Sequence, residues 1–204
     1  MAKIRAKFLK GNLQAYDRRK YIWKLIYAHI LGYDVDFGHD VAVSLINCAR
    51  LQDKVTGYIA IGIMLDEKSD SNIFVNCIDT IKQDLTCGNE IREALALGTL
   101  GNMAPPSLAI ELAPAVIHKC LIENRSTPVY VRKKATMCLL SMMRRQKLIY
   151  QPPVWVEGMH SLLQSTNYGL LLSACSLLRT TIIMFGYEPY VDLVPQLVNI
   201  LAEI

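Results

Sequence analysis

The sequence predicts an all-α fold built from stacked, antiparallel helix pairs. Apolar residues recur three and four positions apart along most of the chain, and alternating strand patterns are absent. Similar helical segments also return at a period near that of helical-hairpin repeats. The composition agrees, because 52% of the 204 residues are hydrophobic and only 20% are charged. That apolar content is ample to offset the entropy lost when the chain becomes ordered.

The apolar periodicity places helices along nearly the whole chain. We expect them near residues 17–31, 38–49, 53–65, 70–85, 89–103, 105–122, 127–146, 152–164, 168–185 and 189–202. Asp53, Asn89 and Thr127 are typical of helix N-caps, because their short polar side chains can accept hydrogen bonds from backbone N–H groups of the first turn.

Four of the expected helices resemble one another. The segments "DKVTGYIAIGIML", "NEIREALALGTLG", "VYVRKKATMCLLSMM" and "YGLLLSACSLLRT" align at Val55, Ile91, Val131 and Leu170, with separations of 36, 40 and 39 residues. In each, an aliphatic residue is followed by an alanine where a neighbouring helix can approach closely, at Ala60, Ala94 or Ala96, Ala135 and Ala174. This period, with two helices per unit, predicts a solenoid of HEAT or armadillo type, which has no central active-site cleft by default. A general scaffold for protein interactions is therefore one functional hypothesis.

Positive charge is concentrated at the N-terminus. The formal net charge is +4 overall, but residues 1–24 carry +7, which leaves −3 for the remaining 180 residues. The cations of this segment are Lys3, Arg5, Lys7, Lys10, Arg18, Arg19, Lys20 and Lys24, against Asp17 alone. Such asymmetry indicates a surface for anionic partners, although a solvated helix start is the simpler alternative.

Cysteine and histidine spacing argues against metal sites and disulfides. The six cysteines include no CxxC pair and lie mostly in apolar segments, which favours reduced, buried thiols; they are Cys48, Cys77, Cys87, Cys120, Cys138 and Cys175. The four histidines form neither HxxxH nor HExxH. We expect no metal and no other cofactor.

No enzyme motif was found. The phosphate-binding loop, the dinucleotide fingerprint and GxSxG are all missing. Asp34, Asp36 and His39 keep an enzyme hypothesis open, but aspartates in such a turn more often cap the next helix. Zinc-finger and RRM signatures are also missing, so we expect no nucleic acid.

Two features near the middle of the chain have a structural and a functional interpretation. "RKKA" at 132–135 is typical of cations that line a repeat ridge, and Arg144, Arg145 and Lys147 suit the last turn of a helix. Met137, Met142 and Met143, together with Trp155, suggest a peptide groove, whereas core packing is the commoner role for methionine. Trp23 is also expected to pack between helices.

The chain shows no membrane span and no signal peptide. No run reaches the roughly 18 uncharged apolar residues that a span needs, and "MAKIRAKFLKGNLQ" lacks an apolar signal-peptide core. We expect a soluble, cytosolic protein.

Taken in order, several motifs resemble the N-terminal trunk of the large adaptin subunits of clathrin adaptor complexes. They are "IRAKF", "RRKY", "KLIYAHILGYDVDFGH", "TGYIAIGIMLDE", "CIDTIKQDL", "ALALGTLGNM", "YVRKKA" and "LVPQLV", and they run essentially from end to end. "RRKY", "DVDFGH" and "VWVEGMHSLL" resemble alpha-adaptin, whereas "MLDE", "TLGNM" and "LVPQLV" resemble gamma-adaptin. The basic motif favours alpha.

The resemblance implies a right-handed alpha-solenoid and a phosphoinositide headgroup site. Carried over residue by residue, that site comprises Arg18, Arg19, Lys20, Tyr21 and Lys24, with Tyr16 upstream and Lys7 further away. Arginines replace lysines in the family's triplet, and the loop before Tyr16 is one residue shorter. A helix N-terminus and several cations together also suit a dense cluster of anionic oxygens, such as an inositol phosphate.

The resemblance further implies that residues 1–204 are a single N-terminal fragment of a longer trunk, whose first helix lies upstream. The implied protein is a non-enzymatic subunit in vesicle transport and endocytosis, cytoplasmic and peripheral on membranes. Its implied partners are phosphoinositides and a second large, a medium and a small adaptor chain. Plasma-membrane coated pits suit an alpha type, whereas a gamma type would act at the trans-Golgi network or endosomes, with an Arf-type GTPase.

Overall fold

A computed structural model describes residues 2–11, 13–65, 71–103, 105–122 and 127–203. Within these ranges the regular structure is helical and contains no strand, which confirms the all-α class. The chain falls into two compact units, Met1–Asp84 and Leu85–Ile204.

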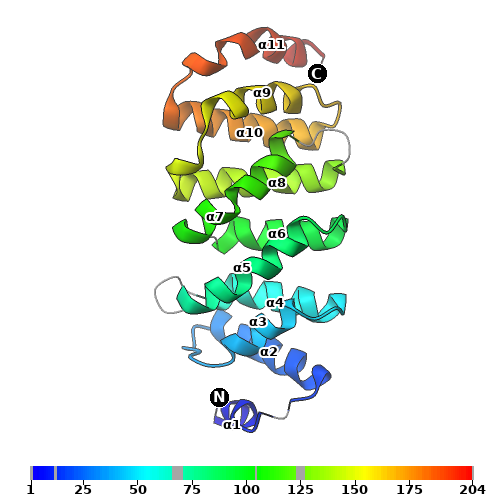
Figure 1. Ribbon diagram of the computed structural model, residues 1–204, viewed down its shortest axis with the longest axis vertical. Helices are drawn as coiled ribbons and strands as arrows, with labels where there is room; N and C mark the ends of the chain where they lie inside the picture. Colours follow the sequence, from blue (N-terminus) through cyan, green and yellow to red (C-terminus); the bar gives the residue numbers. More distant parts are fainter. Residues whose placement is uncertain (1, 12, 66–70, 104, 123–126, 204) are drawn as a thin grey trace. The chain divides into compact units, whose positions relative to one another are not determined.

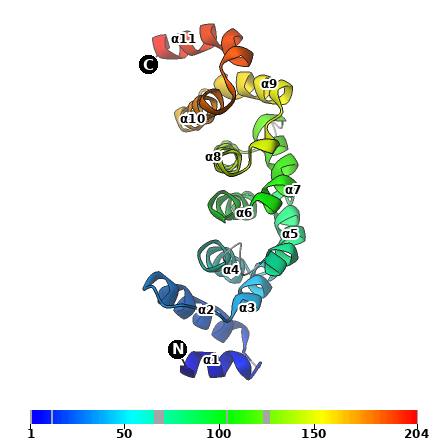
Figure 2. The same cartoon turned by 90° about the vertical axis from the view of Figure 1, so that its left-hand side faces the viewer.

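The first unit holds the N-terminal helices in two layers. They are α1 (Ala2–Leu9), α2 (Ala15–Ile30), α3 (His39–Ile46), α4 (Leu51–Met64) and α5 (Ser71–Leu85). Figure 1 shows these helices in chain order, and Figure 2, turned by 90°, shows α2 and α4 on one side and α3 and α5 on the other. Helix α4 packs against both α2 and α3. Ile22, Leu25 and Ile61 are fully buried in this unit, so one face of α2 is part of its core.

The second unit continues the helix pairs. Its elements are α6 (Glu90–Met103), α7 (Pro106–Ile117), the π-helical turn η1 (His118–Ile122), α8 (Val129–Arg145), the short 3₁₀ turn η2 (Lys147–Ile149), α9 (Pro152–Leu163), α10 (Tyr168–Phe185), the 3₁₀ turn η3 (Glu188–Leu193) and α11 (Val194–Glu203). Figure 2 shows α6, α8 and α10 in one layer with α7 and α9 beside them, and α8 packs against α6, α7 and α10. Helix pairs stacked in this way are those of a HEAT-like solenoid.

The repeated alanines lie where the sequence placed them. The four aligned segments form α4, α6, α8 and α10, and Ala60, Ala96, Ala135 and Ala174 are each fully buried. Ala94, the alternative in the second segment, is 9% exposed, so Ala96 is the better equivalent. The predicted repeat is therefore a real structural unit.

Most of the predicted boundaries agree with the structure, with some differences. Asn89 caps α6 as expected, because its side chain accepts the Arg92 N–H at 3.2 Å. Thr127 does not cap α8, which begins at Val129 after Pro128. The helix expected at 105–122 becomes π-helical over its last five residues, His118–Ile122. Pro114 lies one turn before this change and lacks the backbone N–H that a regular α-helical hydrogen-bond ladder needs. Helix α1 was not predicted.

The six cysteines are free thiols, and three of them are fully buried. Burial raises the pKa of Cys77 to about 11 and that of Cys120 to about 12. Cys48 and Cys175 are partly exposed and Cys87 is exposed, so the expected burial holds for only half of the set. No cluster of potential metal ligands occurs in the part of the chain that the structure describes.

Among the described helices, α10 is long and apolar enough to cross a bilayer by length and composition alone. It packs against α8 and α9 as part of the second unit. Core helices of this kind pass the same test.

Candidate functional site

Helix α2 has one buried face and one exposed face. Ile22, Leu25 and Ile26 are buried, and their spacing is that of a core-facing stripe. The opposite side exposes Tyr16, Lys20, Trp23, Lys24 and Tyr27, which recur at helical spacing and form what we call the α2 stripe. Trp23 is 44% exposed and Tyr16 and Tyr27 are each 65% exposed, so the expectation that Trp23 packs between helices was wrong.

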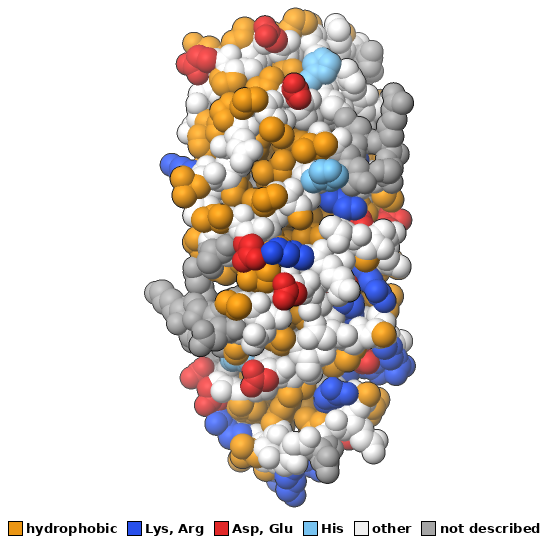
Figure 3. Space-filling model, in the orientation of Figure 1, with side chains coloured by type: hydrophobic (Ala, Val, Ile, Leu, Met, Phe, Trp, Pro, Cys, Tyr) orange, Lys and Arg blue, Asp and Glu red, His pale blue; other side chains and the backbone are white. Residues whose placement is uncertain are grey.

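The two lysines of the α2 stripe lie one turn apart and are both exposed. The Lys20 ammonium lies 5.9 Å from the centre of the Tyr16 ring, and the Lys24 ammonium lies 5.4 Å from the centre of the Tyr21 ring. Such cation–aromatic contacts restrict where the ammonium groups lie. Figure 3 shows Lys and Arg side chains mixed with hydrophobic ones over α1 and α2, at the lower end of the view.

Arg19 is directed into the protein. Its guanidinium donates to the Asp53 carboxylate at 3.1 Å and to the Gln52 side chain at 3.0 Å. The Asp53 side chain is only 6% exposed, and Asp53 lies within α4 rather than capping it, so the predicted cap was wrong. A buried carboxylate needs such a partner, which gives Arg19 a structural role between α2 and α4.

Arg18 and Tyr21 are half-buried. The Nε of Arg18 has no hydrogen-bond partner among the described residues. The Tyr21 ring makes an edge contact with Phe8, at 6.3 Å between centroids, and so holds α1 against α2. Lys7 is exposed on α1 beside Phe8. The structure therefore brings the predicted site residues into one region, with Lys7, Lys20 and Lys24 facing solvent.

Helix α1 is fixed to the loop that follows α2. Arg5 pairs with Asp36, and its guanidinium lies 4.6 Å from the centre of the Phe37 ring. Phe8 also contacts Phe37, at 5.6 Å between ring centroids. Gly38 completes this junction with φ of 86°, and a Cβ there would lie 2.6 Å from Leu25 Cδ1, so only glycine suits the position.

Asp34 and Asp36, the aspartates of the enzyme hypothesis, are both exposed. The hydrogen bond from Arg5 holds the pKa of Asp36 below its usual value. Asp34 is exposed, and the N-cap of α3 is Gly38, so neither aspartate caps this helix as expected. Asp36 is thus an exposed ion-pair partner, which is a structural role.

The cations of α8, like those of α2, include both buried and exposed side chains. Arg132 is 7% exposed, and burial lowers its pKa, whereas Lys133 and Lys134 face solvent. Arg145 donates to the Asn102 carbonyl near the end of α6, and Arg144 donates to the Thr180 hydroxyl of α10 at 3.4 Å. These two arginines therefore link neighbouring repeats as well as lying in the last turn of α8.

The stacked helix pairs and the basic N-terminal helices define a helical-repeat protein whose N-terminal helices carry exposed cations. The chain belongs to the family described as "Adaptin N terminal region", whose model matches residues 1–204. It is 38% identical to AP-2 complex subunit alpha-1 of Arabidopsis thaliana, over 94% of this chain and 18% of that protein. It is 36% identical to AP-2 complex subunit alpha-2 of Dictyostelium discoideum, over 100% of this chain and 20% of that protein.

Gamma-type proteins are similar as well. AP-1 complex subunit gamma-like 2 of Mus musculus is 34% identical over 100% of this chain and 25% of that protein. The chain thus spans about a fifth to a quarter of the length of these relatives. They are subunits of adaptor complexes rather than enzymes, and they agree with the resemblance to alpha-adaptin first and gamma-adaptin next.

A structural comparison supports the same fold. A chain of the "Homology model of the full-length AP-3 complex in an intermediate open conformation" matches with a TM-score of 0.69 and 22% identity. The match covers 94% of this chain and 32% of that one. It agrees with a helical solenoid of HEAT-like repeats.

Proposed function

We propose that the chain is part of a large subunit of a clathrin adaptor complex that acts in vesicle-mediated protein transport. The family match over the whole chain and the adaptor-subunit relatives support this. The partners would be a second large, a medium and a small adaptor chain. The protein would be cytoplasmic and peripheral on the membrane, as one trunk fragment formed by residues 1–204.

Within that function, the α2 stripe is the surface that binds a phosphoinositide membrane. The observation that carries this proposal is the exposure of two lysines one turn apart, flanked by the exposed rings of Tyr16, Trp23 and Tyr27. Lysines near an anionic leaflet contribute about 1 kcal/mol each. Tyrosine and tryptophan favour the membrane–water interface, since their rings are apolar and their tips are polar.

The other predicted residues have supporting roles in this proposal. Arg18 and Lys7 flank the stripe and add positive charge for a multivalent headgroup. Arg19 and Tyr21 position the helix, because Asp53 and Phe8 engage their side chains. One patch of this size gives weak attachment, so stable recruitment would need further sites elsewhere in the complex.

The alpha-type relatives favour the plasma membrane and endocytosis, with phosphatidylinositol bisphosphate in coated pits as the ligand. The alternative is a gamma-type subunit at the trans-Golgi network or endosomes, with an Arf-type GTPase as a partner. The 34% identity to a gamma-like subunit supports this alternative. A preference for phosphatidylinositol 4-phosphate would favour it.

Vesicle sedimentation tests the lipid site. The chain should bind vesicles containing phosphatidylinositol bisphosphate more tightly than phosphatidylserine vesicles of equal total charge, and binding should weaken as salt rises. Substituting both lysines, Lys20→Gln and Lys24→Gln, should weaken binding about 30-fold, because two contributions of about 1 kcal/mol are lost. Arg19 is left unchanged because its loss would strand the buried Asp53 carboxylate.

The matched control is Lys3→Gln with Lys10→Gln, which removes the same charge from exposed positions outside the α2 stripe. This control should keep the preference for the bisphosphate. Equal losses of vesicle affinity in the two double variants would show that binding depends only on the overall positive charge of this region, which would contradict the proposal.

A further inference from the structure

Helices α8 and α10 carry an unbalanced positive charge. Val129–Arg145 and Tyr168–Phe185 together contain no aspartate or glutamate, but they contain the six cations Arg132, Lys133, Lys134, Arg144, Arg145 and Arg179. Because the charge of these two helices is not neutralised from within them, their shared surface favours an anionic partner.

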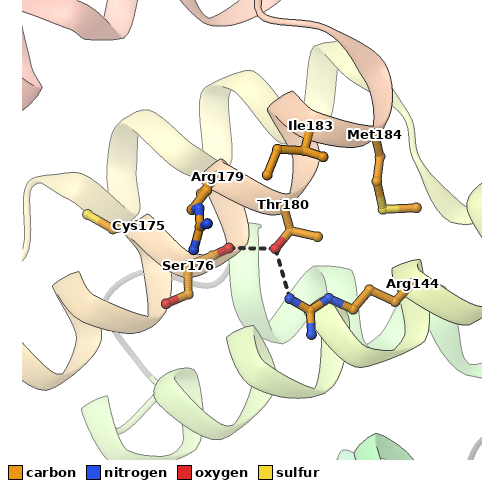
Figure 4. Close-up of a pocket in the computed structure, with 7 residues that line it drawn as sticks. All are labelled: Arg144, Cys175, Ser176, Arg179, Thr180, Ile183 and Met184. Atoms are coloured by element: carbon orange, nitrogen blue, oxygen red, sulfur yellow. Dashed lines mark hydrogen bonds between the residues drawn. The ribbon is translucent and has the colours of Figure 1, made fainter.

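Two of these cations face a cavity of about 600 Å³ between α8 and α10. Figure 4 shows Arg144 from α8 and Arg179 from α10 extending into the space between the helices. Thr180 accepts a hydrogen bond from Arg144 at 3.4 Å, while its own hydroxyl donates to the Ser176 carbonyl at 2.9 Å. Neither arginine has a carboxylate partner among the described residues, and Arg144 gives only one of its five N–H donors to Thr180, so both guanidinium groups keep donors for a ligand.

A second cavity, of about 340 Å³, lies between α6 and α8 and shares Arg144 with the first. Lys134 and Met137 of α8 also line it, opposite Gly98 of α6. A Cβ at Gly98 would meet nothing within 4 Å, which shows how open this wall is. The two cavities therefore adjoin at Arg144, and we call their combined path across α6, α8 and α10 the track.

Exposed apolar side chains accompany the cations along this track. Ile183 is 72% exposed and Met137 is 46% exposed. Met142, Met143 and Trp155 are fully buried, so the core interpretation holds for them. Met137 differs, and an exposed methionine beside basic residues is a feature of peptide-binding surfaces.

We propose that this track, the basic groove of Gly98, Lys134, Met137, Arg144, Arg179 and Ile183, binds an extended acidic peptide segment of a partner protein. Carboxylates of the segment would pair with Arg144 and Arg179, whose forked donors suit them. Apolar side chains between the carboxylates would contact Met137 and Ile183.

The dimensions of the groove favour a peptide. Neighbouring helices pack about 8–10 Å apart, so a track over three helices spans about 16–20 Å. An extended chain covers that distance with about five or six residues. A recess between helices admits such a chain, whereas the flat surface of a bilayer cannot enter it.

The test uses fluorescence anisotropy with a labelled hexapeptide of alternating glutamate and leucine. The native chain should bind this peptide and should bind poorly to a version in which glutamine replaces each glutamate. The double variant Arg144→Gln with Arg179→Gln should bind the acidic peptide at least about tenfold more weakly, because charge-assisted hydrogen bonds are lost. Both side chains are exposed, so circular dichroism should show unchanged helicity.

A variant matched in charge separates the groove from general basicity. Lys10→Gln with Lys147→Gln removes two exposed cations outside the groove and should leave peptide affinity within about twofold of the native value. Equal affinity of the native chain and the groove variant, or equal binding of the two peptides, would overturn the proposal. The proposal would also be overturned if the groove variant lost affinity for phosphatidylserine vesicles as strongly as it lost affinity for the peptide, since the occupant would then be a membrane.

Discussion

Replacing Asp84 by alanine is expected to lower the free energy of unfolding by about 3–5 kcal/mol. Asp84 lies near the end of α5 and is 3% exposed. It pairs with Lys54 of α4, which is 4% exposed, and accepts a hydrogen bond from the Tyr58 hydroxyl at 2.7 Å. Without the carboxylate, the Lys54 ammonium would remain buried with no opposite charge, which is far costlier than losing an exposed ion pair.

Urea unfolding followed by circular dichroism measures this loss. The control is Asp79→Ala, which removes an exposed carboxylate from the same helix and should change stability by less than about 0.5 kcal/mol. Adding Lys54→Met to Asp84→Ala should recover part of the loss, because it removes the stranded charge. Similar midpoints for Asp84→Ala and Asp79→Ala would show that the pair does not stabilise the first unit.

The second large effect concerns the contact between α3 and α4. A Cβ at Gly57 would lie 2.7 Å from the Ile46 backbone nitrogen and 3.0 Å from the Ala42 carbonyl oxygen. Because these neighbours are backbone atoms, α3 would have to move as a whole. We expect Gly57→Ala to destabilise by about 1–3 kcal/mol even though alanine favours a helix.

The matched change in α6 should have the opposite sign. Gly98 lies inside α6, and a Cβ there would meet nothing within 4 Å. Gly98→Ala should therefore stabilise by about 0.8–1 kcal/mol through helix propensity alone. Thermal unfolding of both variants tests the difference, and a stabilised Gly57→Ala would contradict the close packing of α3 on α4.

The repeat architecture was predictable because similar apolar helical segments recur along the sequence at nearly constant spacing. A buried alanine four or five residues after the aligned aliphatic residue, such as Ala60 or Ala174, marks a close helix contact in each repeat. Helix α1 was missed because it is short and rich in cations, and no residue of it is buried. Its position depends on Phe8 and on the pair between Arg5 and Asp36, which are 31 residues apart and leave no local pattern.

The candidate site was only partly predictable. The basic triplet was visible in the sequence, but the inward direction of Arg19 depends on Asp53, a distant partner. Asp53 resembles a helix cap in the sequence because it lies close to the start of α4, and nothing local reveals its partner in α2. Ile22, Leu25 and Ile26 recur at the spacing of a buried face, but Trp23 lies on the opposite side of α2 although it is large and aromatic. The five-residue pattern of the α2 stripe was a signal that could have shown the exposed face.

Tryptophan emission tests the central claim, that the α2 stripe faces the membrane, most directly. The chain has two tryptophans, of which Trp23 is 44% exposed and Trp155 is fully buried. Vesicles containing phosphatidylinositol bisphosphate should shift the emission of the native chain to shorter wavelength, because Trp23 leaves water for the interface. The Trp23→Phe variant should show no shift. An unchanged native spectrum while the chain sediments with the vesicles, or an equal shift in the variant, would contradict the account.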